Sequence, residues 1–397
     1  MEPLHILVAG GGIGGLAAAY VLARDGHRVT VLEQSARFGE IGAGIQLGPN
    51  IFRMFDWLGL TEAINAVAFF PPGMGMNDVR TGEKVVRVPL GEAVKAVYGY
   101  PYGLIYRADL HKVLLDACRR FENVTLRTSS KVDGFEQDGS GVTARLAAGE
   151  TLRGDALVGA DGLWSRVREA VVGDGKPRVS GHIAYRAVLR REEVPSHLWN
   201  DEVLLWGGEK THLVHYPLRR GELFNLVAVF HSNKYDEGWN TFGDTAELNE
   251  RFAHAVPQVK ELLARIETWK MWVLCDREPV KDWSRGRVTL LGDAAHPMLQ
   301  YLAQGAGQAI EDAVVLGQAL KFTQGDAEEA FRKYQQARYL RTGRVQLTAR
   351  FYGDIYHASG VTRELRNAMF QGGRESAGFA GLKWMYEGID PERLFER

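Results

Sequence analysis

The chain has 397 residues, which suits about two domains at roughly 150 residues each. Hydrophobic residues make up 45% and charged residues 24%, as in ordinary globular proteins, so a disordered chain is excluded. The 48 basic and 49 acidic side chains leave a formal net charge of -1, which excludes a chain-wide attraction for nucleic acid or an anionic membrane and favours a small-molecule partner.

The cysteines and the N-terminus indicate the cellular compartment in which the protein is expected. Cys118 and Cys275 are far apart and lack the spacing of a metal site, so neither a disulfide framework nor a bound metal is expected. The first residues have no basic flank or cleavage site, and no apolar run reaches the roughly 18 residues of a membrane span. A cytoplasmic protein is therefore expected.

The first 33 residues predict a βαβ unit. Residues 4–9 form an apolar run, residues 16–24 have helical spacing with alanine and leucine on one face, and residues 27–33 are rich in β-branched side chains. A strand, a helix and a second strand within about 30 residues are typical of a parallel sheet.

Glycines fill the turn between the first strand and the helix. Gly10, Gly12 and Gly15 have the spacing that lets backbone approach a pyrophosphate at a helix N-terminus. Glu33 ends the second strand, where a carboxylate can bind the ribose hydroxyls of an adenosine. Alone, the triplet is also compatible with a glycine-rich turn that binds nothing.

The middle of the chain predicts a second sheet. Two short alternating runs lie between residues 67 and 97, and alternation returns over residues 181–230, which favours antiparallel strands. Helical spacing is expected over residues 109–121, 248–268, 305–320 and 327–351.

The predicted architecture is α/β: a Rossmann-like domain built from discontinuous pieces, an inserted, mainly antiparallel β-sheet substrate domain, and C-terminal helices. The expected boundaries are residues 1–75, 100–178 and 284–345 for the nucleotide-binding domain, 76–99 and 179–283 for the substrate domain, and 346–397 for the C-terminal helical segment.

Two acidic residues follow predicted strands. Asp161-Gly162 comes after the apolar run 157–160, and Gly292-Asp293 after the run 288–291. In α/β sheets ligands collect at the carboxyl ends of strands. Taken singly, such dipeptides are also common surface turns.

Together with the glycine triplet, these motifs resemble the single-component flavoprotein aromatic hydroxylases, the para-hydroxybenzoate hydroxylase fold group, from residue 4 to about residue 345. The resemblance implies an FAD-binding domain and a homodimer. The residues that it implies hold FAD are Gly10, Gly12, Gly15 and Glu33 at the ADP half, Arg107 and Asp293 toward the ribityl chain and its phosphates, Val132 by a backbone contact to adenine, and Gly305. Asp161 is implied to serve both FAD and the passing nicotinamide cofactor. Arg107 is also compatible with a solvated arginine at a helix start.

The resemblance further implies the reaction. Reduced flavin reacts with dioxygen to a C4a-hydroperoxide that hydroxylates an electron-rich aromatic ring. A second glycine triplet is absent, because members of this family take NADH or NADPH as a transient co-substrate without a separate domain for it. NADH is the expected reductant, and NADPH stays open as the alternative.

A strand over residues 211–217 carries the candidate catalytic pair. Side chains alternate faces, so His212 and Tyr216 share one face and His215 points to the other. A histidine with a pKa near 7 is suited to take the proton of a phenol whose pKa is near 10. The alternative is an exposed histidine and a tyrosine in the core.

The loop after Gly292-Asp293 narrows the substrate. Most members of the family have a proline where this chain has Gln300, and a glycine where it has Ala303. This departure resembles the branch that hydroxylates 3-hydroxybenzoate at carbon 6, para to the hydroxyl, to 2,5-dihydroxybenzoate (gentisate). The resemblance implies that His212, Tyr216 and Gln300 surround an aromatic hydroxy acid. The sequence singles out no arginine or lysine for its carboxylate.

Other activities stay open at this point. A salicylate-type hydroxylase and a hydroxypyridine-carboxylate hydroxylase are alternatives within the family. A flavin-binding regulator or a flavin halogenase belongs to another class, although the halogenase motif Trp-x-Trp-x-Ile-Pro is absent from the sequence. Turnover distinguishes these possibilities.

Overall fold

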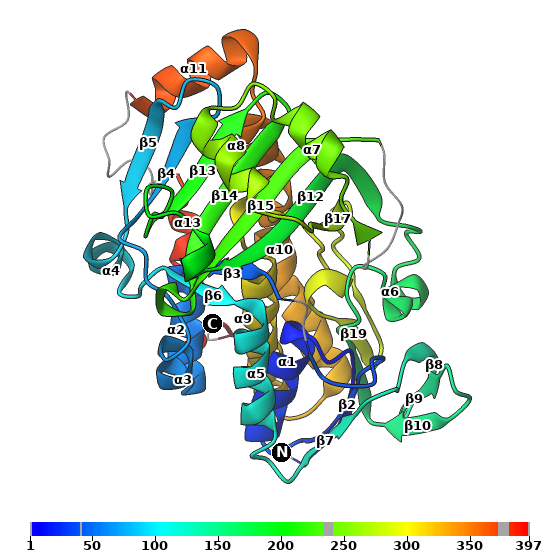
Figure 1. The fold of residues 1–397 in the computed structure, drawn as a ribbon. Helices are drawn as coiled ribbons and strands as arrows, with labels where there is room; N and C mark the ends of the chain where they lie inside the picture. The colour runs from blue at the N-terminus through cyan, green and yellow to red at the C-terminus, as the bar shows by residue number, and fades with distance from the viewer. Residues whose placement is uncertain (1, 40–41, 234–240, 372–380, 396–397) are drawn as a thin grey trace.

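A six-stranded sheet forms the nucleotide-binding half of the protein in the computed structural model, which describes residues 2–39, 42–233, 241–371 and 381–395 (Figure 1). In order across the sheet, its strands are β18 (Ser284–Arg285), β19 (Val288–Leu290), β11 (Ala156–Gly159), β1 (His5–Ala9), β2 (Arg28–Leu32) and β7 (Val124–Arg127). All neighbouring pairs are parallel except β18 and β19.

The central strand of this sheet is covered on both faces. Ile6, Leu7 and Val8 on β1 have no exposed surface, as expected for a parallel strand between layers of helices. The helices packed together beside the sheet are α1 (Ile13–Arg24), α5 (Arg107–Cys118), α9 (Gly305–Phe322) and α10 (Ala327–Tyr356). The predicted βαβ unit and the α/β fold are confirmed.

An eight-stranded sheet forms the other half. In order, its strands are β16 (Thr241–Phe242), β17 (Lys270–Asp276), β12 (Arg178–Arg190), β15 (Leu223–His231), β14 (Thr211–Leu218), β13 (Val203–Gly208), β4 (Gly73–Asp78) and β5 (Lys84–Pro89). Neighbours are antiparallel except β13 and β4. The expected second, mainly antiparallel sheet is confirmed.

The helix expected over residues 248–268 is wrong as a single element. The structure has α7 (Thr245–Arg251) and α8 (Pro257–Ala264) instead. Proline lacks an N–H donor, so Pro257 cannot continue α7, but it occupies the first position of α8, where that donor is not needed.

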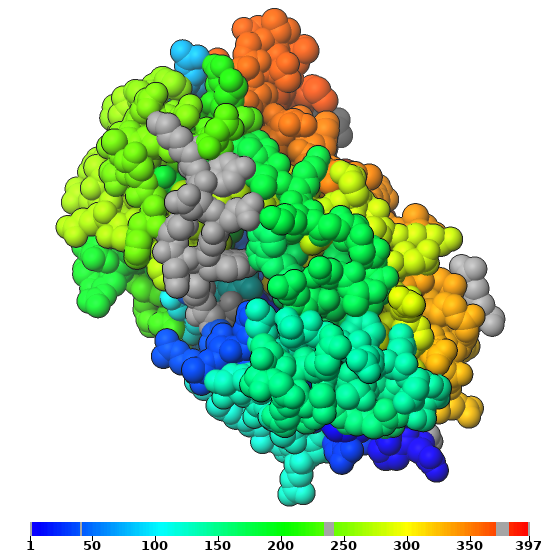
Figure 2. Space-filling model, turned by 90° about the vertical axis from the view of Figure 1, so that its right-hand side faces the viewer, coloured from blue at the N-terminus to red at the C-terminus, as the bar shows by residue number. Residues whose placement is uncertain are grey.

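The two faces of the larger sheet have different neighbours. Leu226 and Phe230 pack in one apolar cluster with Leu248 of α7 and Val259 of α8. The opposite face packs on the nucleotide-binding half. Tyr216 on this face lies in one apolar cluster with Leu299 and Leu302, which follow β19 in the chain. In Figure 2, α7 and α8 lie in the yellow-green upper left, and the teal segment with β8 (Val132–Asp138), β9 (Gly141–Leu146) and β10 (Thr151–Gly154) lies below.

Shorter elements complete the fold within the described ranges. The remaining helices are α2 (Pro49–Leu58), α3 (Thr61–Asn65), α4 (Glu92–Tyr98), α6 (Arg166–Val171), α11 (Gly360–Gln371) and α13 (Lys383–Tyr386), and β3 (Gly44–Leu47) pairs with β6 (Gly103–Tyr106). α10 runs without a break across the expected boundary at residue 346, and the division into domains stays a prediction. Within the described ranges, no helix is both long and apolar enough to cross a membrane.

Candidate active site

The glycine turn after β1 has no room for side chains. Gly10 has φ +106°, and a Cβ there would lie 2.3 Å from the carbonyl oxygen of Ala160. A Cβ on Gly15 would lie 2.0 Å from the carbonyl oxygen of Gly10. Both glycines are therefore needed for the turn itself, and they leave bare backbone at the start of α1.

Two helix N-termini meet beside this turn. A Cβ on Gly14 of α1 would lie 2.8 Å from Leu291 Cδ2 and 3.1 Å from Ala309 Cβ of α9. The residues before the two helices, Gly12 and Gln304, make no side-chain hydrogen bond to the helix that follows. Two uncapped N-termini present free N–H groups and the positive ends of two helix dipoles, which fits the pyrophosphate of a dinucleotide.

Glu33 is held beside the turn by backbone donors. Its carboxylate oxygens accept hydrogen bonds from the backbone N–H of Gly11 and of Ser35, both at 2.8 Å. Each oxygen retains a further lone pair for a ribose hydroxyl. Ser130 N–H donates to the Glu33 carbonyl at 2.8 Å, which brings the start of β8, with its predicted contact Val132, next to Glu33.

Asp161 has a contact that its position in the sequence does not reveal. Its carboxylate accepts hydrogen bonds from Ser165 Oγ and from the backbone N–H of Arg166 (2.8 Å) and Val167 (3.2 Å), so it caps α6. Burial raises the pKa of Asp161. A role of Asp161 toward FAD stays a prediction.

The start of α9 adjoins the carboxylate that follows β19. Asp293 is exposed, and a Cβ on Gly305 would lie 3.8 Å from Asp293 Oδ1. Arg107, at the start of α5, donates its backbone N–H to the Ala43 carbonyl at 2.8 Å and so fixes the chain just before β3. The roles predicted for these three residues toward FAD stay predictions.

His212 and Tyr216 lie on one face of β14, as predicted. The register pairs Tyr216 with Asn225 on β15, and Asn225 Oδ1 accepts a hydrogen bond of 2.8 Å from Gly44 N–H of β3. A Cβ on Gly44 would lie 2.6 Å from the Tyr216 ring, so the tyrosine faces the nucleotide-binding half. His215 lies on the other face, where its Nε2 accepts a hydrogen bond of 3.0 Å from Trp206 Nε1–H.

His212 is the first member of a chain of imidazoles. Its Nδ1 lies 2.7 Å from Nε2 of His357, and Nδ1 of His357 lies 3.0 Å from Nε2 of His231. The ring of His182 stacks on His231 at 4.1 Å between centroids. His357 follows α10, and nothing in the local sequence distinguishes it as a partner of β14.

Burial makes these imidazoles weak bases. It lowers the pKa of His212 to about 3, so the expectation of a histidine with a pKa near 7 is wrong. Burial also lowers the pKa of His231 and brings that of His357 well below its usual value. The chain is therefore neutral at pH 7, and each ring can accept a hydrogen bond at one nitrogen and donate at the other.

The same cluster has the ligand type of a transition-metal site. Ligand nitrogens of His182, His231 and His357 lie within 4.8 Å of one another. His231 and His357 already hydrogen-bond to each other, and His182 Nδ1 hydrogen-bonds to the hydroxyl of Tyr301. These contacts account for the cluster without a metal.

Gln300 opens a 3-10 turn, η4 (Gln300–Leu302), that packs against the same face of the large sheet. Its Oε1 accepts a hydrogen bond from Nη2 of Arg186 on β12. Arg186 was not predicted from the sequence, although it lies two residues beyond Ala184 and four beyond His182 on one face of an alternating strand. Ala303, where most relatives have glycine, adopts φ +53° in the left-handed region.

A buried ionic network anchors this loop. His296 Nε2 lies 2.6 Å from Asp312 Oδ2, which also accepts a hydrogen bond of 2.9 Å from Gly292 N–H. Arg338 of α10 binds Glu311 and Asp312 of α9, each at 2.7 Å. The carboxylates, the guanidinium and the imidazole are shielded from solvent, so α9, α10 and the loop with Gln300 are held as one unit.

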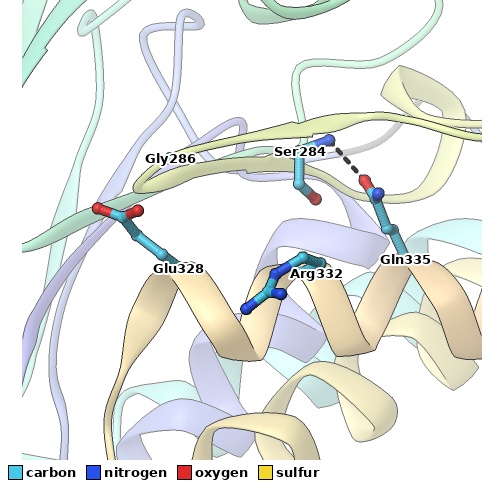
Figure 3. A pocket seen from close by; sticks show the side chains of 5 residues that line it. All are labelled: Ser284, Gly286, Glu328, Arg332 and Gln335. Carbon is cyan, nitrogen blue, oxygen red and sulfur yellow. Dashed lines mark hydrogen bonds between the residues drawn. The ribbon is translucent and has the colours of Figure 1, made fainter.

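A separate hollow lies between β18 and the first turns of α10 (Figure 3). It is lined by Ser284, Gly286, Glu328, Arg332 and Gln335, and Gln335 Oε1 accepts a hydrogen bond of 2.9 Å from Ser284 N–H. None of the predicted site residues lines it.

Comparisons with known proteins agree with this arrangement. A family model described as FAD binding domain matches residues 4–346. The chain is 46% identical over 383 residues to the 3-hydroxybenzoate 6-hydroxylase of Polaromonas naphthalenivorans (strain CJ2), a match covering 96% of each protein. It is 42% identical over 383 residues to the Klebsiella oxytoca protein of that name, again 96% of each.

Solved structures show the same fold. Klebsiella pneumoniae HpxO complexed with FAD and uric acid superimposes with a TM-score of 0.87 at 28% identity, covering 97% of each chain. A salicylate hydroxylase in complex with its substrate has a TM-score of 0.83 at 26% identity, covering 99% of this chain and 97% of the other.

Proposed function

The chain belongs to the FAD binding domain family, and we propose that it is an FAD-dependent monooxygenase that hydroxylates 3-hydroxybenzoate at carbon 6, forming gentisate with NADH and dioxygen. The observation that supports this substrate best is the placement of the three residues: His212 and Tyr216 share one face of the large sheet, and the turn that begins at Gln300 packs on that face. The two relatives of that name agree with it.

Bound FAD supplies the hydride-accepting and oxygen-activating chemistry. The glycine turn, the two uncapped helix N-termini and Glu33 are the groups suited to its ADP half. Gly305 and Asp293 adjoin the start of α9, where its ribityl chain is expected. The network of Arg338, Glu311 and Asp312 keeps the loop with Gln300 in place beside it.

His212 is suited to take the phenolic proton in spite of its low pKa. When Nδ1–H of His212 donates to Nε2 of His357, and Nδ1–H of His357 donates to Nε2 of His231, the free lone pair of His212 is on Nε2. A substrate hydroxyl that donates to this nitrogen passes its proton on, and each imidazole releases one from Nδ1. His231 is half-buried and passes the last proton to solvent.

The relay leaves no charge on a buried imidazole. The O–H bond of the substrate breaks, one N–H bond forms and one breaks on each imidazole, and the net change is the loss of the phenolic proton. Because an imidazolium in this cluster would be strongly disfavoured, the proton has to move through rather than stay. The resulting phenolate raises the electron density at the para carbon, which is carbon 6 of 3-hydroxybenzoate.

Tyr216 and Gln300 are suited to positioning. Burial raises the pKa of Tyr216 far above its usual value, so it stays a neutral hydroxyl donor at every physiological pH. Gln300 uses Oε1 for Arg186, which leaves its amide N–H groups as donors to the substrate.

Product analysis tests the proposal. The FAD-loaded enzyme is given NADH and, separately, 3-hydroxybenzoate, salicylate, 4-hydroxybenzoate or 6-hydroxynicotinate, and products are identified together with hydrogen peroxide. Stoichiometric gentisate from 3-hydroxybenzoate alone is the expected result. The proposal that 3-hydroxybenzoate is the substrate would be refuted if this acid gave only hydrogen peroxide while another acid was hydroxylated with full coupling. Replacing NADH by NADPH in the same assay measures which reductant the enzyme prefers.

The assembly and location are part of the proposal. A homodimer in the cytoplasm is expected from the family resemblance. Several large apolar side chains on the C-terminal helices are exposed, which agrees with a covered surface in an assembly: Leu340, Leu347, Phe351, Val361, Leu365 and Met369. Light scattering of the purified protein measures the oligomeric state.

A further inference from the structure

Arg186 occupies the middle of the sheet face that carries the site. It pairs with Val227 of β15 on one side and with Lys270 of β17 on the other. Val227 in turn pairs with Val214, which lies between His212 and Tyr216 on β14. Because paired residues share a face, Arg186 points to the same side of the sheet as the candidate catalytic pair.

Among the described residues, the contacts of Arg186 include no acidic side chain that would balance its positive charge. Nη2 donates to Gln300 Oε1, and the guanidinium carbon lies 5.3 Å from the centre of the Trp272 ring. Nε is shielded from solvent and has no hydrogen-bond partner in the described part of the chain. No carboxylate among the described residues forms an ion pair with this arginine.

Arg186 as a whole is half-buried, although its Nε is shielded, and the fully buried arginines of the described ranges have carboxylate partners. Arg338 binds Glu311 and Asp312, and Arg168 binds Asp174 at 2.6 Å. A buried guanidinium without such a partner is costly. Burial lowers the pKa of Arg186 to about 10, the direction expected where nothing compensates the charge. The guanidinium of Arg186, which lies beside the proposed substrate site without a carboxylate partner, is therefore suited to bind an anionic ligand.

We propose that Arg186 binds the carboxylate of the aromatic acid, with Nε and one terminal N–H donating to its two oxygens while Gln300 orients the guanidinium. This inference rests on the proposed function and identifies the recognition element that the sequence left open. A guanidinium is the cation suited to two parallel bonds to a carboxylate.

The strand order puts the two proposed anchors on different strands of the sheet. β12 and β14 are separated by β15, which puts their backbones roughly 10 Å apart at about 4.8 Å per strand. Arg186 thus holds the acid group from one strand, and His212 receives the hydroxyl from another. When both groups are held, the ring has a single orientation. The two anchors, and not the shape of the site alone, then decide that the carbon para to the hydroxyl is the one that reacts.

The test is a cycle of two changes, Arg186→Met in the enzyme and removal of the charge in the ligand. Binding of 3-hydroxybenzoate and of neutral 3-hydroxybenzamide to the FAD-loaded enzyme is followed by the flavin absorbance. In the variant, the affinity for 3-hydroxybenzoate should fall about 30-fold or more, as for other buried charge pairs that lose one partner. The affinity for 3-hydroxybenzamide should change less than about threefold.

Three controls make the outcome decisive. Arg190→Met, an exposed arginine on the same strand, should change neither affinity. Arg186→Lys should recover part of the loss. Arg186→Met should be at least as stable as the parent without ligand, because it removes an uncompensated charge. Equal loss of both ligands, loss of FAD, or failure to fold would overturn the inference and give Arg186 a role toward the flavin or the fold.

Failure of this inference is separable from failure of the proposed function. If the parent protein converts another aromatic acid instead of 3-hydroxybenzoate, the same cycle is run with that acid and its amide. A loss confined to the acid then supports Arg186 as the carboxylate site although the proposed substrate is wrong. If Arg186→Met forms gentisate as well as the parent does, the proposed substrate is right and Arg186 is not its carboxylate site.

Discussion

Nδ1 of His212 lies 2.7 Å from Nε2 of His357, although 145 residues separate them in the chain. The contact joins the strand that carries the candidate base to the end of the longest described helix, and His357 continues it to His231 at 3.0 Å. Both outer rings belong to the large sheet, and the middle one does not. In the proposed relay, proton removal from the substrate would therefore depend on how α10 docks on that sheet.

His212→Ala should separate flavin chemistry from hydroxylation. The variant should retain FAD and its reduction by NADH but release hydrogen peroxide in place of most of the gentisate, because the phenolic proton loses its acceptor. Oxygen uptake, peroxide and product measured together give the coupling. His215→Gln is the matched control: this residue is on the opposite face, and its coupling should equal that of the parent. Full coupling in His212→Ala would remove the residue from the mechanism.

His357→Phe should change the pH profile of hydroxylation rather than the binding of FAD. The ring fills a similar volume but cannot pass a proton, so turnover should fall at pH 7 and recover as the pH rises toward the phenol pKa of about 10. The kcat is measured from pH 6.5 to 9.5. A profile parallel to that of the parent would mean that His357 only fills space.

The buried histidines should make the protein sensitive to acid. The pKa is lowered to about 3 for His212 and His215 and to about 4 for His182, against 6.5 in the unfolded chain. As the pH falls below 6.5 the unfolded state binds protons that the folded state does not, so stability is lost on acidification. Each of the first two should cost about 1 kcal/mol between pH 7 and 5.5.

Urea unfolding at the two pH values measures this loss. His215→Gln, which keeps an acceptor for Trp206, should reduce the difference by about 1 kcal/mol. An unchanged difference in this variant would show that His215 is already protonated in the folded protein.

Ala303→Gly should stabilise the loop that carries Gln300. A left-handed conformation costs a non-glycine residue about 1–2 kcal/mol, part of which is offset by the greater freedom of glycine in the unfolded chain. A gain of about 0.5–1 kcal/mol is expected in the free energy of unfolding. Ala246→Gly in helix α7, where glycine has no such benefit, should be destabilising. Destabilisation by both substitutions would contradict the strain at Ala303.

Glu33→Ala should lose FAD without unfolding the protein. The carboxylate accepts hydrogen bonds from the backbone N–H of Gly11 and of Ser35 and is the predicted ribose ligand. The variant should therefore purify with less than about a tenth of the parent FAD content. This corresponds to a loss of about 1.4 kcal/mol or more in the free energy of FAD binding. Glu83→Ala, a substitution of an exposed glutamate elsewhere, serves as control. Normal flavin absorbance in Glu33→Ala would contradict the assignment.

Local pattern was sufficient for much of this site. The spacing of Gly10 and Gly15 predicted a turn that the structure confirms, and the period of two along β14 placed His212 and Tyr216 on one face. Such features depend on residues close in the chain, whose sterics decide φ, ψ and the direction of each side chain. The break at Pro257 could also have been predicted, because proline at that position ends one helix and starts the next.

Sequence by itself determined the α/β fold, the glycine turn and the face that carries the candidate pair. Tertiary structure alone decided that His357 and His231 extend His212, that Arg186 meets Gln300 across 114 residues, and that burial lowers the pKa of His212 far below 7. The physical reason is range: backbone preferences act over a few residues, whereas hydrogen bonds between distant strands and the loss of solvation are set only when the two halves pack together.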